Sequence, residues 1–127
     1  MKNQPFRARM GFALEGILAC WREEASFRAQ VRLAGVAAVA LAVFRPAPVW
    51  WALIALVCAL VLALELVNSA MEAVIDRLHP EIHPSIKLAK DMLAGAVLTM
   101  SLASLLVGLA MVVDAGPRLL GEIGVWR

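Results

Sequence analysis

The chain has 127 residues, of which 62% are hydrophobic, and its formal net charge is +2. Soluble domains are about 45–50% apolar, so this composition predicts an integral membrane protein with one domain over residues 1–127. The charged residues form no basic run and no basic patch interleaved with aromatic side chains, which argues against a nucleic-acid partner.

Residues 6–23 are expected to form an amphipathic helix that lies in the membrane surface. Apolar residues stand three or four positions apart, which gathers them on one helical face: Phe6, Met10, Leu14, Ile17 and Trp21. Trp21 is expected at the level of the lipid headgroups. Charged residues recur throughout the segment, so it is not a signal peptide. A helix packed against other protein is the alternative interpretation.

The first membrane span is predicted at about 27–44. Its uncharged part, 33–44, is too short for a bilayer, so the span must include Arg28 and Arg32. Those side chains must then reach the interface or face the protein interior. Residues 34–38 are small, which favours close packing against other helices in a bundle.

The second span is predicted at about 49–65, after a proline-containing turn at 45–48, and the helix is expected to continue to residue 78. Cys58 lies in the middle of this span, whereas Cys20 precedes the first span. Because the two thiols are expected at different depths, no disulfide is predicted between them.

His79 and His83 stand four residues apart, a spacing that binds zinc on a helix. Pro80 and Pro84 disfavour a helix at this point, so a surface loop is the preferred interpretation.

Helix is expected to resume with Ser85 as its cap, and the third span is predicted at about 91–113. Asp114 and Pro117 are expected to end it and to leave a short tail at 114–127. The predicted fold is therefore all-α, with a surface helix and three transmembrane helices.

Positive charge is concentrated before the first span and between the second and third spans. The positive-inside rule then places the N-terminus and the second loop in the cytoplasm and the C-terminus on the other side. The residues concerned are Lys2, Arg7, Arg9, Arg22, Arg28 and Arg32, then Arg77, Lys87 and Lys90, against Arg45, Arg118 and Arg127 elsewhere.

A stripe of polar residues begins where the second apolar run stops. Residues 46–64 carry no charge, and Glu65, Asn68, Glu72 and Asp76 follow at helical spacing on one face. Such groups can simply hydrogen-bond helices together. Three acids and an amide on one stripe at the edge of the hydrocarbon favour a functional site.

These residues suit phosphoryl transfer to a lipid alcohol. Carboxylates can hold Mg²⁺, Lys90 can balance phosphate charge, and a carboxylate at headgroup level can accept a proton from a hydroxyl. No soluble nucleotide-binding loop is present in the sequence. On chemistry alone, a non-enzymatic proton-pathway element or an oligomeric channel subunit is equally compatible with the stripe.

Residues 65–77, Glu-Leu-Val-Asn-Ser-Ala-Met-Glu-Ala-Val-Ile-Asp-Arg, followed by Ala89-Lys90-Asp91, resemble the signature of the bacterial integral-membrane diacylglycerol kinases. The segment Trp21-Arg-Glu-Glu-Ala-Ser-Phe-Arg28 resembles the family's sequence before its first span, and the resemblance covers roughly 11–113. Undecaprenol kinases share the second-span motif. They typically carry Glu-Arg-Asn where this chain has Glu24-Ala25-Ser26-Phe27-Arg28, which favours the diacylglycerol branch.

The resemblance implies an ATP-dependent kinase that converts 1,2-diacylglycerol to phosphatidic acid, with Mg²⁺ as cofactor, ATP as co-substrate and undecaprenol as the alternative acceptor. It further implies a homotrimer with shared active sites in the bacterial inner membrane, with a periplasmic C-terminus. Gln30, Leu93-Ala94 and Phe12 depart from the family pattern, which has an acid, Gly-Ser and an aromatic hydroxyl there.

The resemblance also assigns roles to single residues. It makes Glu65 the general base, with Asn68 beside it, and makes Glu24 and Glu72 the ligands that join Mg²⁺ to ATP. Further ATP contacts fall on Glu81, His83, Lys90 and Asp91. Lipid contacts fall on Glu65, Trp21, Ser26, Phe27, Gln30 and Ala94.

Overall fold

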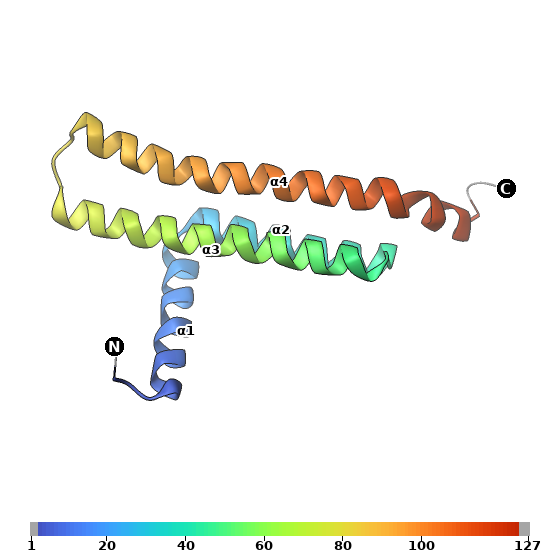
Figure 1. Ribbon diagram of the computed structural model, residues 1–127, viewed down its shortest axis with the longest axis horizontal. Coiled ribbons are helices and arrows are strands. Elements are labelled where there is room, and N and C mark those ends of the chain that lie inside the picture. The colour runs from blue at the N-terminus through green and yellow to red at the C-terminus, as the bar shows by residue number, and fades with distance from the viewer. Residues whose placement is uncertain (1–2, 125–127) are drawn as a thin grey trace.

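The computed structural model describes residues 3–124, which form four α-helices (Figure 1). These are α1 (Phe6–Glu23), α2 (Ala25–Phe44), α3 (Pro48–Leu78) and α4 (Pro84–Glu122). The predicted all-α fold is confirmed. Lys2 and Arg127 of the topology argument, and the last three residues of the predicted tail, lie outside the described residues.

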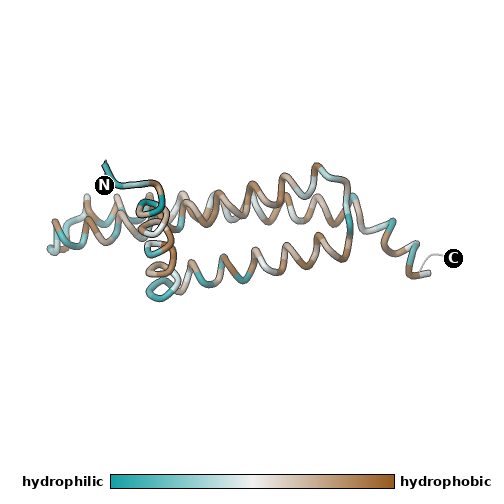
Figure 2. The backbone as a smooth tube through the Cα atoms, turned by 90° about the horizontal axis from the view of Figure 1, so that it is seen from below, coloured by the Kyte–Doolittle hydropathy of each residue, from teal (hydrophilic) through white to brown (hydrophobic). Residues whose placement is uncertain are grey.

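Three helices lie side by side, and α1 projects to one side of them (Figure 1). The helices α2, α3 and α4 are each long and apolar enough to cross a membrane. Hydrophobic residues dominate their central parts, whereas α1 and the ends of the bundle include hydrophilic stretches (Figure 2). The C-terminal part of α3 and the beginning of α4 lie side by side and extend past the start of α2 to the turn that joins them (Figure 1).

One face of α3 organises the bundle. Its buried residues are Ile54, Val57, Val61 and Glu65, spaced three, four and four residues apart. This is the spacing at which side chains share one face of a helix. The predicted polar stripe extends the same series through Asn68, Glu72 and Asp76. The face that packs inside the bundle therefore becomes the polar face beyond Glu65.

The packed core occupies the half of the bundle that lies far from the α3–α4 turn. Leu41, Ile54 and Met111 form its centre, with partly buried side chains from α2, α3 and α4 around them. Most other large apolar side chains remain exposed, including Leu105 and Leu106 of α4. Such a surface suits lipid, where van der Waals packing and polar contacts hold helices together.

A single extended residue, Glu24, separates α1 from α2. Arg28 reaches back from α2, and its Nη1 atom donates to the carbonyls of Trp21 at 2.9 Å and Arg22 at 3.0 Å. These carbonyls belong to the last turn of α1, where no helical N–H is available to them. Arg28 thus fixes the corner between the helices instead of extending toward the lipid surface.

The beginning of α4 differs from the prediction, because His83 and not Ser85 caps the helix. The Nδ1 atom of His83 accepts a hydrogen bond from the Ser85 backbone N–H at 3.2 Å. Pro84 occupies the first turn, where its fixed φ fits a helix and its missing N–H costs nothing. The helix therefore begins before Ser85.

The end of α4 also differs, because the helix continues past Asp114 and through Pro117 to Glu122. Polar contacts with the α2–α3 connection hold these additional turns. Arg118 donates to the carbonyls of Phe44 and Arg45, and Arg45 pairs with Glu122 at 2.8 Å. The Trp50 indole N–H also donates to Asp114 at 2.8 Å. These interactions offset the helical hydrogen bond that Pro117 cannot donate.

Candidate active site

Glu65 lies on the face of α3 that meets α2, and it is only 2% exposed. Its Oε2 atom accepts a hydrogen bond from the Ser26 hydroxyl at 2.9 Å. The backbone carbonyl of the same residue accepts from the Ser69 hydroxyl at 2.9 Å, and Ser69 lies 3.5 Å from the Cys20 sulfur of α1. Side chains of α1 and α2 therefore meet α3 around the residue that the family resemblance predicts to be the base.

Asn68, one turn beyond Glu65, contains a buried side-chain oxygen. Within residues 3–124, this Oδ1 atom finds no hydrogen-bond donor. A buried acceptor without a donor costs about 1–3 kcal/mol, so such atoms commonly mark a place where a ligand or water binds. The amide beside Glu65 is therefore available to a hydroxyl group.

A hollow of about 510 Å³ lies between α1 and α3, and we call it the α1–α3 hollow. Glu24 and Glu72 both line it, so one chain brings the two predicted Mg²⁺ ligands to the same concavity. Its acidic lining residues are Glu23, Glu24, Glu72 and Asp76.

The donor set of the α1–α3 hollow consists of carboxylate oxygens, the ligand type that Mg²⁺ prefers. No three His, Cys, Asp or Glu side chains among the described residues gather closely enough to form a metal site by themselves. Mg²⁺ usually binds through one or two carboxylates together with water and substrate phosphates. Glu24 and Glu72 therefore fit a metal that arrives with a nucleotide.

A second hollow, of about 320 Å³, lies at the α3–α4 turn, and we call it the turn hollow. It contains all four of the further predicted ATP contacts, together with Asp76 and Lys87. Those four are Glu81, His83, Lys90 and Asp91. In the sequence only the family resemblance connects these residues, and in the structure the turn places them around one space.

Asp76 belongs to both hollows and had received no individual role from the sequence. Its carboxylate accepts a hydrogen bond from Lys90 Nζ at 2.9 Å. The signal was present in the sequence, because Asp76 continues the spacing of the polar stripe. Asp76 thus joins the α1–α3 hollow to the turn hollow.

The Lys90 ammonium is held in its charged form. The hydrogen bond to Asp76 raises its pKa, desolvation acts in the opposite direction, and the charges of Asp76 and Glu72 add to the increase. Lys87 pairs with Asp91 one turn away on α4. A permanent positive charge therefore lies beside the acidic stripe, where phosphate groups need one.

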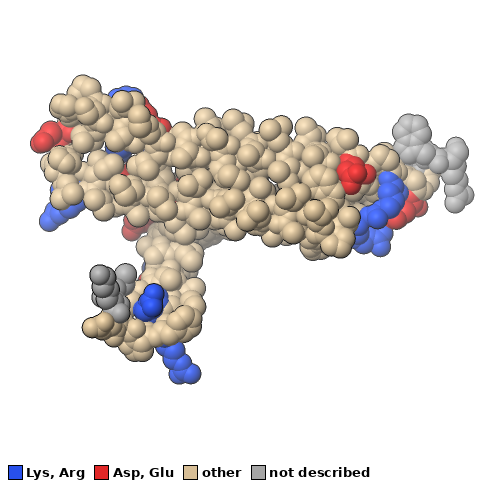
Figure 3. Space-filling model, in the orientation of Figure 1, with Lys and Arg blue, Asp and Glu red and all other residues tan. Residues whose placement is uncertain are grey.

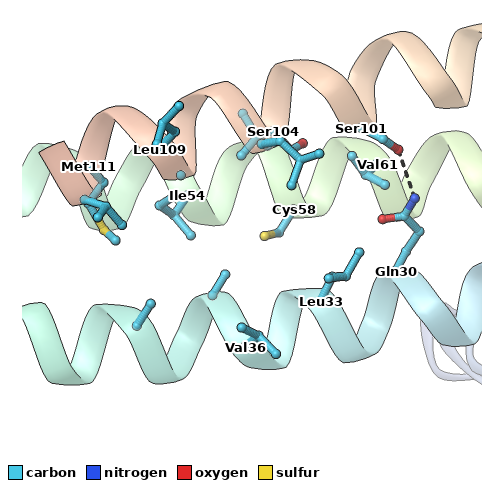
Figure 4. Close-up of a pocket in the computed structure, with 16 residues that line it drawn as sticks. Gln30, Leu33, Val36, Ile54, Cys58, Val61, Ser101, Ser104, Leu109 and Met111 are labelled. Carbon is cyan, nitrogen blue, oxygen red and sulfur yellow. Dashed lines mark hydrogen bonds between the residues drawn. The ribbon is translucent and has the colours of Figure 1, made fainter.

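A mostly apolar groove of about 320 Å³ runs along α2, α3 and α4, and we call it the membrane groove (Figure 4). Gln30 lies at one end, where its Nε2 atom donates to the Ser101 hydroxyl at 2.9 Å (Figure 4). Val61, one turn before Glu65 on α3, also lines it. The groove therefore follows the face of α3 that leads to Glu65.

The remaining predicted lipid contacts do not line the membrane groove. Phe27 is buried at 3% exposure within the bundle, and Trp21 lies on the exposed face of α1. Ala94 lies exposed on α4. Of the six predicted lipid residues, the structure brings Glu65 and Ser26 into direct contact and places Gln30 at the groove.

Charged side chains are distributed at the ends of the molecule. On the face shown in Figure 3, acidic and basic groups gather near the two ends of the bundle and on α1, and the central part carries none. Glu72, Asp76 and Lys90 belong to the end that contains the α3–α4 turn, and the buried Glu65 lies about two helical turns before Glu72 on α3.

Comparison with known proteins supports the resemblance noted in the sequence. The family model described as prokaryotic diacylglycerol kinase matches residues 11–112. This range contains the buried glutamate and both hollows. No match was found among curated proteins.

Proposed function

Because the chain belongs to the prokaryotic diacylglycerol kinase family, we propose that it phosphorylates the primary hydroxyl of 1,2-diacylglycerol with ATP and releases phosphatidic acid. Family membership implies a lipid kinase of this type. The observation that best supports the specific proposal is the buried Glu65 carboxylate, which lies where the apolar face of α3 becomes polar.

Glu65 acts as the general base in this proposal. The lipid hydroxyl approaches the carboxylate within hydrogen-bonding reach, and its oxygen attacks the terminal phosphorus of ATP. The bond between that phosphorus and the bridging oxygen breaks, ADP leaves, and Glu65 takes the hydroxyl proton. Asn68 Oδ1, which has no donor among residues 3–124, accepts a hydrogen bond from a water beside the incoming alcohol.

The nucleotide occupies the two hollows that share Asp76. Glu24 and Glu72 would hold Mg²⁺, which neutralises phosphate charge when bound. Lys90 contributes positive charge from the other side, and Glu81, His83 and Asp91 of the turn hollow contact the rest of ATP. Positioning and charge neutralisation of this kind supply most of the catalysis in phosphoryl transfer.

The acyl chains remain in the hydrocarbon, and we assign one of them to the membrane groove. Its lining is predominantly apolar, and it extends from Gln30 along the face that carries Val61 and Glu65. A chain seated there leaves the glycerol hydroxyl near the headgroup level of the base.

We further propose that the protein lies in the inner membrane with α1 on the cytoplasmic surface and assembles as a homotrimer. The apolar face of α1 is uncovered in the single chain, which supports contact with lipid. The exposed apolar surfaces of the long helices provide faces for partner copies as well as for lipid.

The test is transfer of phosphate from Mg-ATP to diacylglycerol by the purified protein in mixed micelles. Replacing Glu65 by Gln is expected to lower kcat by about 10²–10⁴-fold, because the base is lost. Glu15→Gln changes an exposed α1 carboxylate outside the α1–α3 hollow and is the matched control. Activity of Glu65→Gln equal to that of the wild type would contradict the assignment. Parallel assays with undecaprenol decide between the two acceptors.

A further inference from the structure

Ser26 contacts the proposed base Glu65, and the sequence alone did not reveal this contact. It lies in the first turn of α2, and its Oγ atom is 2.9 Å from Glu65 Oε2 across 39 positions of sequence. Among the residues that the structure describes, no other side chain or backbone N–H donates to that carboxylate. The orientation of the base therefore depends on one hydroxyl from a neighbouring helix.

The surroundings of Ser26 keep this hydroxyl in place. Glu24, two residues earlier, forms the corner between α1 and α2, and Arg28 ties that corner to the end of α1. Phe27 is buried beside it. Ser26 itself is exposed whereas Glu65 is not, so the serine lies at the rim of the site.

A buried carboxylate needs such a donor. An ionised carboxylate taken out of water is destabilised unless hydrogen bonds or opposite charges compensate, and a hydrogen bond to the charged form favours that form. Because Ser26 engages Oε2, the other carboxylate oxygen is free to accept the proton of an alcohol. One oxygen is thus used to orient the base and one remains for chemistry.

We propose that Ser26 is a positioning residue, which holds the Glu65 carboxylate in the orientation that accepts the proton of the lipid hydroxyl. This inference rests on the proposed kinase function. It differs from the lipid contact that the family resemblance implies for Ser26, because the serine acts through Glu65 and not on the substrate.

The first test separates kcat from KM in the mixed-micelle assay. Ser26→Ala is expected to lower kcat by about 10–100-fold, since small displacements of a catalytic group have effects of this size, with KM for both substrates changed less than about twofold. Ser26→Thr retains the hydroxyl and is expected to restore most of kcat. The control is Thr99→Ala, which removes a hydroxyl that bonds only to the Gly95 carbonyl of its own helix.

The second test detects the Ser26–Glu65 hydrogen bond by infrared spectroscopy and does not require catalytic turnover. In protein labelled with ¹³C-glutamate, the infrared carboxylate band that disappears in Glu65→Gln is assigned to Glu65. That band is expected to shift in Ser26→Ala and to remain in place in Ser26→Thr and Thr99→Ala. A band that does not move in Ser26→Ala overturns the inference, whether or not the protein phosphorylates lipid.

The outcomes also separate this inference from the proposed function. If the band shifts but the wild type transfers no phosphate to either lipid, the kinase proposal fails and the catalytic part of the inference fails with it. If the wild type is active and Ser26→Ala retains kcat, the inference alone fails. A change confined to the KM for the lipid would assign the Ser26 hydroxyl to substrate contact. Phosphate found on Ser26 by mass spectrometry would make the hydroxyl a phosphoryl acceptor. Either result overturns the positioning role.

Discussion

At the scale of single residues, the polar groups in the stripe of α3 differ in how many hydrogen-bond donors they have. Glu65 is buried and has one donor, whereas the Asn68 side-chain oxygen is buried and has none within residues 3–124. Glu72 lines the α1–α3 hollow, and Asp76 lines both this hollow and the turn hollow. In the proposed kinase, the stripe therefore changes along its length from groups that would meet a neutral alcohol to groups that would meet charged phosphate and metal.

Loss of the Glu72 carboxylate should weaken the use of Mg-ATP. Glu72→Ala is expected to raise the KM for Mg-ATP by about tenfold or more, because a metal ligand is lost, while the KM for diacylglycerol is unchanged. Initial rates measured against Mg-ATP concentration provide the test. Glu15→Ala, which removes an exposed carboxylate of α1 away from the α1–α3 hollow, should leave both constants unchanged. An unaltered KM for Mg-ATP in Glu72→Ala would remove Glu72 from the metal site.

His83 has two separable roles, as a helix cap and as a proposed nucleotide contact. His83→Ala removes the acceptor for the Ser85 N–H, and loss of an N-cap typically costs about 1 kcal/mol. Hydrogen exchange of the amides at 85–87 is expected to accelerate in this variant. His83→Asn preserves a good cap and should keep the slow exchange. If the imidazole also contacts ATP, both variants will raise the KM for Mg-ATP, and an effect confined to His83→Ala assigns the residue to capping alone.

At the scale of the helices, the two halves of α3 contact different parts of the molecule. Its first half packs Ile54, Val57 and Val61 against α2 and α4 along the membrane groove, and its second half presents acids to α1 and to the turn. A continuous helix fixes the register between the two halves. In the proposed complex, the distance from an acyl chain in the groove to the base is thereby set by the helix itself, at about 1.5 Å of rise per residue.

The membrane groove predicts a dependence on acyl-chain length. Gly108 lines the groove, and a Cβ atom added there would meet no heavy atom within 4 Å, so a larger side chain can be accommodated. Gly108→Leu is expected to raise the KM for long-chain diacylglycerol several-fold and to leave that for dihexanoylglycerol and Mg-ATP unchanged. Gly121→Leu makes the same change on the same helix, at an equally open glycine outside the groove, and serves as the control. Equal effects of the two substitutions would exclude the groove as an acyl site.

The helices themselves were largely predictable, because apolar length and periodicity decide where a chain can cross a membrane. Contacts between helices were not. The Ser26–Glu65 hydrogen bond depends on the register of α2 against α3, and lipid-facing apolar residues do not encode that register. The continuation of α4 past Pro117 likewise depends on Arg118 and Glu122 meeting the α2–α3 connection, which no local pattern reveals. The predicted Ser85 cap failed for a local reason, since a histidine ring nitrogen replaced the usual hydroxyl.

At the scale of the whole molecule, the distribution of charge gives the bundle two different ends. One end carries the acidic stripe, the α3–α4 turn and the root of α1. At the other end, Arg45 and Trp50 contact α4, and Arg118 of α4 contacts the α2–α3 connection. ATP is available only in the cytoplasm, so the proposed kinase requires the turn to face that side. This requirement agrees with the orientation that the positive-inside rule predicts from the sequence.

The orientation can be tested by cysteine labelling in right-side-out membrane vesicles. In a background in which Cys20 and Cys58 are replaced by alanine, Ile123→Cys at the end of α4 is expected to react with a membrane-impermeant maleimide in intact vesicles. Ile82→Cys, in the exposed α3–α4 turn, should react only after the membrane is permeabilised. Leu106→Cys, exposed in the apolar middle of α4, should remain unlabelled in both conditions because the reagent does not enter hydrocarbon. The reverse pattern would place the hollows outside the cell, away from ATP, and would rule out the kinase proposal in this membrane.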